Sequence, residues 1–372
     1  MKLVVNRENF QKLFQVAAIV APQRSPKPIL QNVKLEAFDN SLILTATDTE
    51  VGVRLKMSDV EVKQPGTVVI PVGRLNMIMR ESSDETLTIE GDETKTKVSG
   101  RSSKFELQGQ NPAEFPEVAE VSADDCLEIK AGVLRELIRR TLFATDTESS
   151  RYALGGVLLE HDQKSLVSVG TDGRRLAKME GPVSVVGKPD GGGSATIVPA
   201  RAMQLIERIL PEDEAMVQLL PRANDLVVKV PNGLFTTRLV EGRFPKWRDV
   251  IPKRTETNRI ELAVGPMYSA LRQAAIVSSE ESRGVDFVFS EGNLVLSNST
   301  SEVGQSRIEM PIAYSGPELA IMLDHRYMAD FLKVLPPDQN FTMDVASSDQ
   351  AAYCLTADHY GYVIMPLARD RK

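Results

Sequence analysis

The stretch SVGTDGRRLAKME (168–180) decides the fold, because a relative of it, TATDTEVGVRLKM (45–57), has already occurred in the same chain. Each stretch belongs to a longer strand-like run, and the two aspartates that they share, Asp48 and Asp172, are 124 residues apart. One match can arise by chance. The rest of the chain therefore has to show whether a building block is repeated.

Two further pairs of segments follow in the same order. VVIPVGRLNMIMR (68–80) matches TIVPARAMQLIERIL (196–210), and FELQGQNPAEFPEV (105–118) matches FTTRLVEGRFPKWRDV (235–250). Their shared prolines are 128 and 129 residues apart, so the spacing drifts by only five residues along the chain. This regular spacing indicates a duplication.

The remaining third of the chain reads as a weaker third copy. NLVLSNSTSEVGQSRIEM (293–310) stands where the Thr-x-Asp strands stood, and IMLDHRYMADFLKVL (321–335) stands where the helix after the proline stood. Each copy is about 125 residues long, which suits one small domain. The predicted domains are residues 1–122, 123–254 and 255–372.

Each copy opens with a stretch of helical periodicity, at residues 8–20, 131–144 and 265–277, with apolar side chains at i, i+3, i+4 and i+7. The other runs are short, alternating or apolar, and are separated by turn residues, which is typical of strands. We expect an α+β fold in which each copy packs two helices on β-sheets, with the helices inside and the sheets outside.

Composition excludes several classes of protein. The chain has 372 residues, 42% of them hydrophobic, and no apolar run as long as a membrane helix needs. The opening MKLVVNRENF lacks the features of an export signal, and two cysteines cannot staple so long a chain. We therefore expect a cytoplasmic protein with buried, reduced cysteines and no membrane partner.

No pattern of catalytic or metal-binding residues stands out. The three histidines are scattered, and the glycine-rich stretches lack the spacing of nucleotide-binding loops. Asp48 and Asp172 leave two alternatives open: an aspartate that accepts backbone N–H bonds in a turn, or a carboxylate pair of an enzyme. We expect the turn, no enzymatic activity, no cofactor and no metal.

Charge is distributed unevenly. The net charge is −7, yet five of the six helical stretches are net positive and the sixth is neutral. Arg135 and Arg139 lie four residues apart on one predicted helix face, and Arg201 opens another helix. A solvated face explains any single arginine. Five basic helices in one acidic chain predict a surface that contacts phosphates without reading the DNA sequence.

Seven further segments, spread from one end of the chain to the other, resemble the bacterial DNA polymerase III β subunit, the sliding clamp. They are MKLVVNRENF (1–10), PKPILQNVKLE (26–36), SSRYALGGVLLE (149–160), GTDGRRLA (170–177), LVEGRFPKWRDVIP (239–252), RGVDFVFSEGNLVL (283–296) and YVIMPL (362–367). The combination of GTDGRRLA, EGRFP and the terminal YVIMP is specific to that family.

The resemblance implies a head-to-tail homodimer whose six domains form a closed ring around duplex DNA, with helices lining the bore. Such a processivity factor tethers the DNA polymerase III α subunit and slides without sequence specificity. Its other partners would be the clamp loader and further polymerases and repair proteins. The alternatives are a non-ring repeat scaffold that binds nucleic acid and a module that never closes a ring.

The resemblance also carries DNA-contact residues onto this chain. They are Arg24, Arg74, Glu148, Arg151 and Tyr152. Glu148 stands where relatives have Gln, and the residue after Tyr152 is alanine where many relatives have a second tyrosine. For Arg24 and Arg151, a plain surface charge is the alternative.

A hydrophobic cleft that takes short linear motifs containing Gln, Leu and Phe is also implied. Its matching residues are Leu154, Thr171, Gly173, Arg174, Arg175, Leu176, Pro245, Val250, Val363, Met365, Pro366 and Leu367. Asp249 stands where the family often has Arg, and the tail continues past MPL as ARDRK. Both departures bear on which peptides bind.

Overall fold

The structure, a computed structural model, describes residues 1–118, 125–146, 152–189, 196–252, 258–280, 282–300 and 303–368. The chain divides into two compact units. Unit 1 comprises Met1–Leu134 and Val183–Leu239, and unit 2 comprises Arg135–Pro182 and Val240–Lys372. Both predicted domain boundaries, at 122/123 and 254/255, fall outside the described residues.

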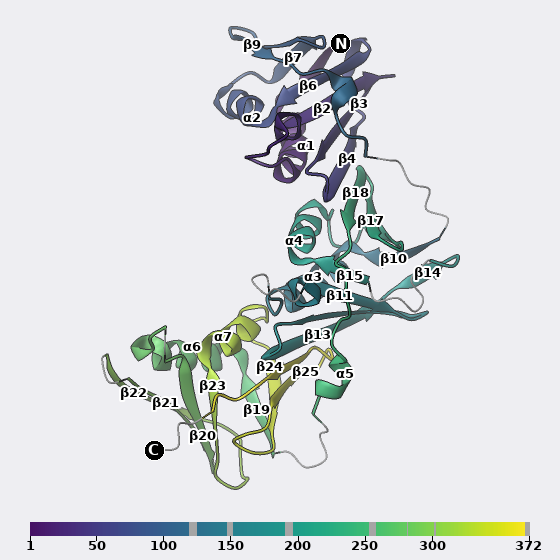
Figure 1. The fold of residues 1–372 in the computed structure, drawn as a ribbon. Coiled ribbons are helices and arrows are strands. Elements are labelled where there is room, and N and C mark those ends of the chain that lie inside the picture. The colour runs from purple at the N-terminus through teal and green to yellow at the C-terminus, as the bar shows by residue number, and fades with distance from the viewer. Residues whose placement is uncertain are drawn as a thin grey trace. The chain divides into compact units, whose positions relative to one another are not determined.

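The first copy alternates strands with two helices (Figure 1). Its elements are β1 (Lys2–Asn6), α1 (Arg7–Val20), η1 (Pro28–Gln31), β2 (Asn32–Phe38), β3 (Ser41–Thr47), β4 (Val51–Met57), β5 (Glu61–Gln64), β6 (Gly66–Pro71), α2 (Val72–Glu81), β7 (Thr86–Gly91), β8 (Lys95–Ser99), β9 (Lys104–Gln108) and η2 (Pro112–Glu114).

The second copy repeats this order and adds a short helix at its end. Its elements are β10 (Cys126–Lys130), α3 (Ala131–Leu142), η3 (Tyr152–Gly155), β11 (Gly156–His161), β12 (Ser165–Thr171), β13 (Arg175–Pro182), β14 (Ser184–Val186), β15 (Thr196–Pro199), α4 (Ala200–Ile209), β16 (Met216–Pro221), β17 (Asp225–Val230), β18 (Gly233–Arg238) and α5 (Trp247–Val250).

The third copy follows the same plan with one strand fewer among its described residues. Its elements are β19 (Asn258–Ala263), α6 (Val264–Ala274), η5 (Ala275–Val277), β20 (Gly284–Ser290), β21 (Asn293–Thr300), β22 (Gly304–Pro311), β23 (Leu319–Asp324), α7 (His325–Lys333), β24 (Asn340–Val345), β25 (Ala352–Thr356) and β26 (Gly361–Ile364). The predicted triplication and the two long helices per copy are confirmed.

Local sequence explains where the helices begin and which face they bury. In α1 the side chain of Asn6 accepts a hydrogen bond from the backbone N–H of Asn9 at 3.1 Å, which satisfies a donor at the helix start. Phe10, Phe14 and Ala17 follow at helical spacing and are fully buried. Burying this stripe against β3 and β4 is what holds the helix, because isolated helices of this length are marginal in water.

Strands at the ends of successive copies pair with each other. In unit 1, β18 pairs antiparallel with β4, so one sheet runs in the order β14-β10-β16-β17-β18-β4-β3-β2-β6. In unit 2, β26 pairs antiparallel with β13, and the strands run in the order β11-β12-β13-β26-β25-β24-β19. The last strand of the second and third copies is thus paired with the fourth strand of the copy before it.

Two further sheets end in exposed edges. The sheet β5-β1-β7-β8-β9 of unit 1 has β9 at one edge, and the sheet β22-β21-β20-β23 of unit 2 has β22 at one edge. An unpaired edge strand presents backbone N–H and C=O groups that a further strand can pair with.

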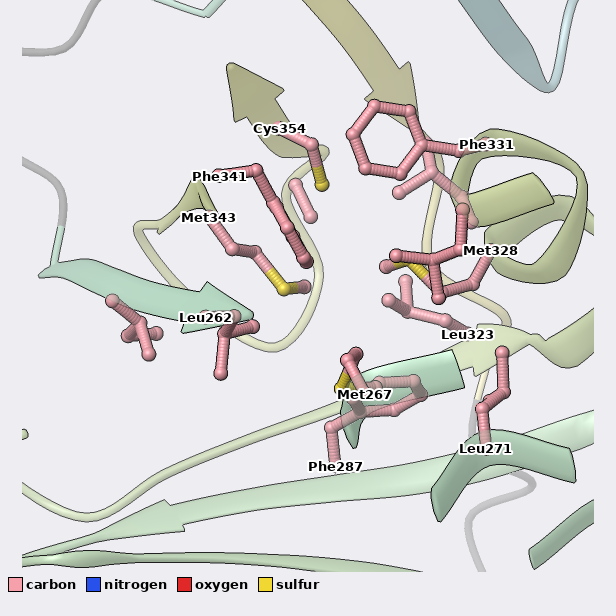
Figure 2. Packing of buried hydrophobic residues seen from close by; sticks show 14 of the residues in the cluster. Leu262, Met267, Leu271, Phe287, Leu323, Met328, Phe331, Phe341, Met343 and Cys354 are labelled. Atoms are coloured by element: carbon pink, nitrogen blue, oxygen red, sulfur yellow. The ribbon is translucent and has the colours of Figure 1, made fainter. Parts of the chain in front are cut away.

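The core of unit 2 draws on all parts of the third copy (Figure 2). Side chains from α6, α7 and the surrounding strands converge on it, and the rings of Phe331 and Tyr362 stack at 5.0 Å between centroids. Cys354 lies in this core and Cys126 is buried in unit 1, both as free thiols, as expected. No helix in the described ranges is long and apolar enough to cross a membrane.

Candidate functional site

The two Thr-x-Asp motifs build the same turn. One oxygen of each aspartate accepts hydrogen bonds from the backbone N–H groups two and three residues on, at 3.0 and 2.8 Å for Asp48 and 2.9 Å each for Asp172. The other oxygen makes an ion pair, Asp48 with Arg201 and Asp172 with Arg175. The turn interpretation is confirmed, and both carboxylates are occupied by these contacts.

Two of the predicted DNA contacts lie in unit 1. Arg24 is exposed in the loop after α1, and Arg74 is exposed in the first turn of α2. A hollow of about 600 Å³ separates that loop from the start of α2, and Gln23 and Arg74 both line it. Exposed cations of this kind suit a phosphate backbone that is gripped loosely.

The third candidate in unit 1, Arg201, opens α4 and is half exposed, but it is already held by Asp48. The Asp48 side chain is only 9% exposed, so the ion pair also satisfies a nearly buried carboxylate. A phosphate that approached Arg201 would compete with that carboxylate. We therefore expect Arg201 to contribute less to DNA binding than Arg74.

Helix α3 has the two faces that its sequence predicts. Leu134, Leu137 and Ile138 are buried, whereas Arg139 is exposed and Arg135 is partly exposed. Arg135 and Arg139 are thus on the side of the helix that solvent reaches.

The charge analysis counted Arg140 among the basic residues of this helix surface, and the structure corrects that count. Its side chain is only 9% exposed, donates to Glu136 at 2.9 Å and to Asp358, and lies over the ring of Tyr360 at 5.3 Å. It holds α3 against the third copy and is not part of the basic surface.

The remaining DNA candidates are beyond what the structure describes. Glu148 and Arg151 lie outside the described residues, and Tyr152 is described only as the first residue of η3, without its side chain.

Most residues of the predicted peptide cleft lie on or just beside the neighbouring strands β13 and β26 of unit 2, and Leu154, Pro245 and Val250 come from η3 and the 245–250 segment. The end of β26 pairs with the start of β13, with Leu176 opposite Val363, and the Met365 N–H donates to the Arg174 carbonyl at 2.9 Å. This pairing brings residues 171–176 beside residues 363–367, which are almost two hundred positions apart. The chain then continues along β23, where the Leu367 N–H donates to Met322.

Burial divides the cleft residues into a floor and a rim. Leu154, Thr171, Leu176 and Val363 are buried, and Pro366 and Leu367 are partly buried. Gly173, Arg174, Pro245, Val250 and Met365 are exposed. Val250 and Met365 are 44% and 42% exposed, which is unusual for large apolar side chains and offers anchoring surface to an apolar ligand.

Gly173 has a local reason to be glycine. Its φ is +86°, a conformation that residues with a Cβ rarely adopt, and its N–H donates to the Thr171 hydroxyl at 3.1 Å. The Thr171 hydroxyl in turn donates to the Arg175 carbonyl at 2.6 Å. These bonds fix the turn that presents Arg174.

Arg175 behaves differently from its neighbour Arg174. Its guanidinium donates to Asp172 at 3.0 Å, to Asp330 of α7 at 2.8 Å and to the Phe143 carbonyl at 2.7 Å, and the side chain is 10% exposed. It also lies over the ring of Tyr327 at 4.4 Å. Arg175 therefore joins β13 to α7, whereas Arg174 is exposed.

Segment 245–250 is tied to β11 of the same unit. The Trp247 indole donates to Glu160 at 3.4 Å, and Arg248 makes an ion pair with the same carboxylate at 2.8 Å. Asp249 is exposed on this short helix, next to Val250. The acidic group that departs from the family pattern is thus on the accessible side of the rim.

Buried ionisable groups near the cleft have structural roles. Burial raises the pKa of the Tyr362 hydroxyl well above its ordinary value, and the hydroxyl donates to the Tyr327 carbonyl at 2.9 Å. Across the described ranges no group of three or more His, Cys, Asp or Glu residues is arranged to hold a metal ion.

Sequence reasoning missed a set of exposed apolar side chains near the two sheet edges. Phe105 on β9 is 40% exposed, Ile276 in η5 is 75% exposed, and Val303 just before β22 is 58% exposed. The Ser306 hydroxyl of β22 donates to the Ala274 carbonyl at 2.7 Å, which holds η5 beside that edge. Ile276 stands at the end of the amphipathic stretch 265–277, and the sequence alone does not show whether such an apolar residue is buried or exposed.

Comparison with known proteins assigns the family. Models of the DNA polymerase III beta subunit match its N-terminal domain at residues 1–119, its central domain at 128–246 and its C-terminal domain at 248–367. The beta sliding clamp of Chlamydia muridarum is 30% identical to this chain over 369 residues, which cover 99% of this chain and 99% of that relative. The beta sliding clamp of Pseudomonas putida is 31% identical over 376 residues, which cover 99% of this chain and 100% of that relative.

Solved structures agree. The Pseudomonas aeruginosa sliding clamp bound to griselimycin has a TM-score of 0.91 at 28% identity, and the Bartonella birtlesii sliding clamp bound to griselimycin has a TM-score of 0.91 at 26% identity. Both comparisons cover 99% of this chain and 100% of the solved chain. This chain therefore belongs to the DNA polymerase III beta subunit family, and it is a processivity factor of DNA replication, not an enzyme.

Proposed function

We propose that two copies of this chain close head to tail into a six-domain ring that encircles duplex DNA. The observation that carries the proposal is the strand pairing between copies. The last strand of the second copy pairs with β4, and the last strand of the third copy pairs with β13. Among the described residues, the last strand of the first copy, β9, and the equivalent of β4 in the third copy, β22, lack a partner of this kind.

A second copy supplies the missing pairing. If β9 of one copy joins β22 of the other, the same contact forms twice and the assembly closes without leaving an edge of this kind. The exposed apolar side chains Phe105, Ile276 and Val303 lie at these two edges, where an interface would bury them. The non-ring scaffold would leave them in water.

Within the ring, we propose that Arg24, Arg74, Arg135 and Arg139 contact the phosphate backbone, with Arg201 in a weaker role, and that Glu148, Arg151 and Tyr152 also take part in DNA contact. Contacts to phosphates carry no sequence information and exchange as the ring slides. The net charge of −7 then disfavours DNA on other surfaces.

The cleft is proposed to bind short linear motifs of the DNA polymerase III α subunit, the clamp loader, and other polymerases and repair proteins. A buried apolar floor and an exposed apolar rim suit a peptide with Leu and Phe anchors. A polymerase held this way rebinds its primer at high effective concentration each time it lets go. We propose that this activity takes place in the cytoplasm. We also propose that the domain boundaries lie at 122/123 and 254/255.

Primer extension tests the tethering role. On a primed single-stranded circle with polymerase and clamp loader, the wild-type protein should lengthen the products of a single binding event, and Met365→Glu should not. A charge at the cleft rim repels the apolar anchor without touching the DNA-contact residues. Met216→Glu, at an apolar residue 49% exposed on β16, is the matched control and should behave as wild type.

Two outcomes would contradict the proposal. One is product length that does not respond to the wild-type protein. The other is a Met365→Glu variant that lengthens products as well as Met216→Glu does.

A further inference from the structure

A second hollow lies in unit 1, away from the peptide cleft and from the arginines proposed to meet DNA. It has a volume of about 310 Å³ and lies where the β17–β18 hairpin meets β3 and β4. The turn of the hairpin is fixed there, because the Lys56 N–H donates to the Asn232 carbonyl at 2.7 Å. Its lining combines the cations Arg54, Lys56 and Lys229 with the apolar residues Ile43, Leu55, Val230, Pro231 and Leu234.

Strand register places these cations on one face of the sheet. Lys34 is opposite Thr45, Thr45 opposite Arg54, Arg54 opposite Leu234 and Leu234 opposite Lys229. Directly opposed residues of an antiparallel pair point to the same side, so one row carries three cations across five strands. Lys56, two residues after Arg54 on β4, lies on the same side and is exposed.

Nearby carboxylates neutralise only part of this charge. Glu36 makes ion pairs with Lys34 at 3.3 Å and with Arg54 at 3.5 Å. Farther along the row, two strands beyond Lys229, Glu128 accepts a hydrogen bond from Gln218 at 3.0 Å. Among the described residues Lys34 and Arg54 pair with Glu36, whereas Lys56 and Lys229 make no ion pair, in a chain whose overall charge is negative.

We propose that this hollow binds an acidic linear segment of a partner protein that carries an apolar anchor residue between its carboxylates. The apolar walls would hold the anchor, and Lys56 and Lys229 would pair with the flanking acids. A phosphate backbone would satisfy the cations but would leave the partly exposed Val230 and the exposed Pro231 uncovered, so a peptide with an apolar anchor fits the lining better than DNA does. The site is separate from the cleft and would engage a different segment of a partner.

Fluorescence anisotropy of the full-length protein tests this site. The probe is a fluorescein-labelled peptide, Asp-Asp-Phe-Asp-Asp-Leu, with Asp-Asp-Ala-Asp-Asp-Ala and Lys-Lys-Phe-Lys-Lys-Leu as comparisons. The first peptide should bind saturably and the other two should not. The double variant Lys56→Glu/Lys229→Glu should weaken binding at least about tenfold, because it replaces two charge-assisted contacts by repulsion.

The matched control is Lys63→Glu/Lys97→Glu, which changes the net charge equally at exposed lysines of β5 and β8. It should leave binding unchanged. Urea midpoints within error of wild type show that both double variants fold, and unchanged product lengths in the primer-extension assay show that the clamp itself still works.

Three results would overturn the proposal. The acidic peptide could fail to saturate on the wild-type protein, or the control could lose as much affinity as Lys56→Glu/Lys229→Glu. In the third, binding of a short labelled DNA duplex requires Lys56 and Lys229 and binding of the peptide does not. The hollow would then be a phosphate site. None of these results bears on ring closure, so this inference can fail while the proposed function stands.

Discussion

At the scale of single residues, chemically similar neighbours take opposite roles. Arg174 and Arg175 are adjacent in GTDGRRLA, yet the first is exposed at the cleft rim and the second is bound by Asp172, Asp330 and a backbone carbonyl. Arg174 lies in the turn before β13, and Arg175 is the first residue of that strand. Which of them faces inward depends on Asp330, which is 155 positions away, and no local pattern contains that information.

Arg140 makes the same point on a helix. The helical period could have separated it from Arg139, but its partners Asp358 and Tyr360 come from the far end of the chain. Counting charges along a helix therefore overestimates the basic surface when one arginine is used inside.

The Arg140–Asp358 pair predicts a pH dependence. Burial by itself raises the pKa of the Asp358 carboxyl, but hydrogen bonds from Thr356 and Arg140 and the charge of Arg140 outweigh it and hold the pKa below its ordinary value of 3.8. A lowered folded-state pKa gives stability that is present above the unfolded pKa and is lost as pH falls through the folded pKa. The wild-type protein should therefore lose this contribution only in acid.

The substitution Asp358→Asn measures how much the Arg140–Asp358 pair contributes to stability. At neutral pH the free energy of unfolding of the variant should be lower by about 1 kcal/mol, because the nearly buried Arg140 loses one of its carboxylate partners. The loss is no larger because Asp358 is itself partly exposed. Urea titrations at neutral pH and at about pH 3 should show this difference shrinking with acid, since Asp358 is then increasingly protonated. A difference that is the same at both pH values would contradict the account.

At the scale of elements, periodicity located the helices well. The stretches at 8–20, 131–144 and 265–277 became α1, α3 and α6 with the η5 turn, because their apolar residues recur at the helical period and are buried. Strand pairing between copies was not predicted. An edge strand has the same alternation whether it is paired or open, so β18, β26, β9 and β22 look alike in sequence.

Ile276→Glu tests the role of the open edge. It should convert the dimer to a monomer, since it puts a charge where the proposed interface buries an apolar side chain that is 75% exposed in the single chain. Sedimentation velocity across a dilution series measures the change. Met216→Glu, with equal charge on a strand not proposed for the interface, should remain a dimer. Equal dimer affinity in the two variants would remove β22 and η5 from the interface.

At the scale of the whole molecule, the sequence offered triplication, basic helices in an acidic chain and no catalytic constellation. Those features point to a repeat scaffold with nucleic acid as a partner, and the family match makes it a sliding clamp. Ring closure depends on a second copy of the chain. The repeats do not encode it locally, but the edges that they leave unpaired, β9 and β22, indicate where it would occur.

The most direct test of the ring is retention on circular DNA. After loading onto a nicked circle by its clamp loader, in moderate salt, the protein should stay bound through gel filtration and should be lost when the circle is cut once. A ring linked topologically slides off a free end, whereas a protein held by phosphate contacts does not distinguish the two forms. Equal retention on the circle and on the linear product would contradict encirclement and favour the non-ring scaffold.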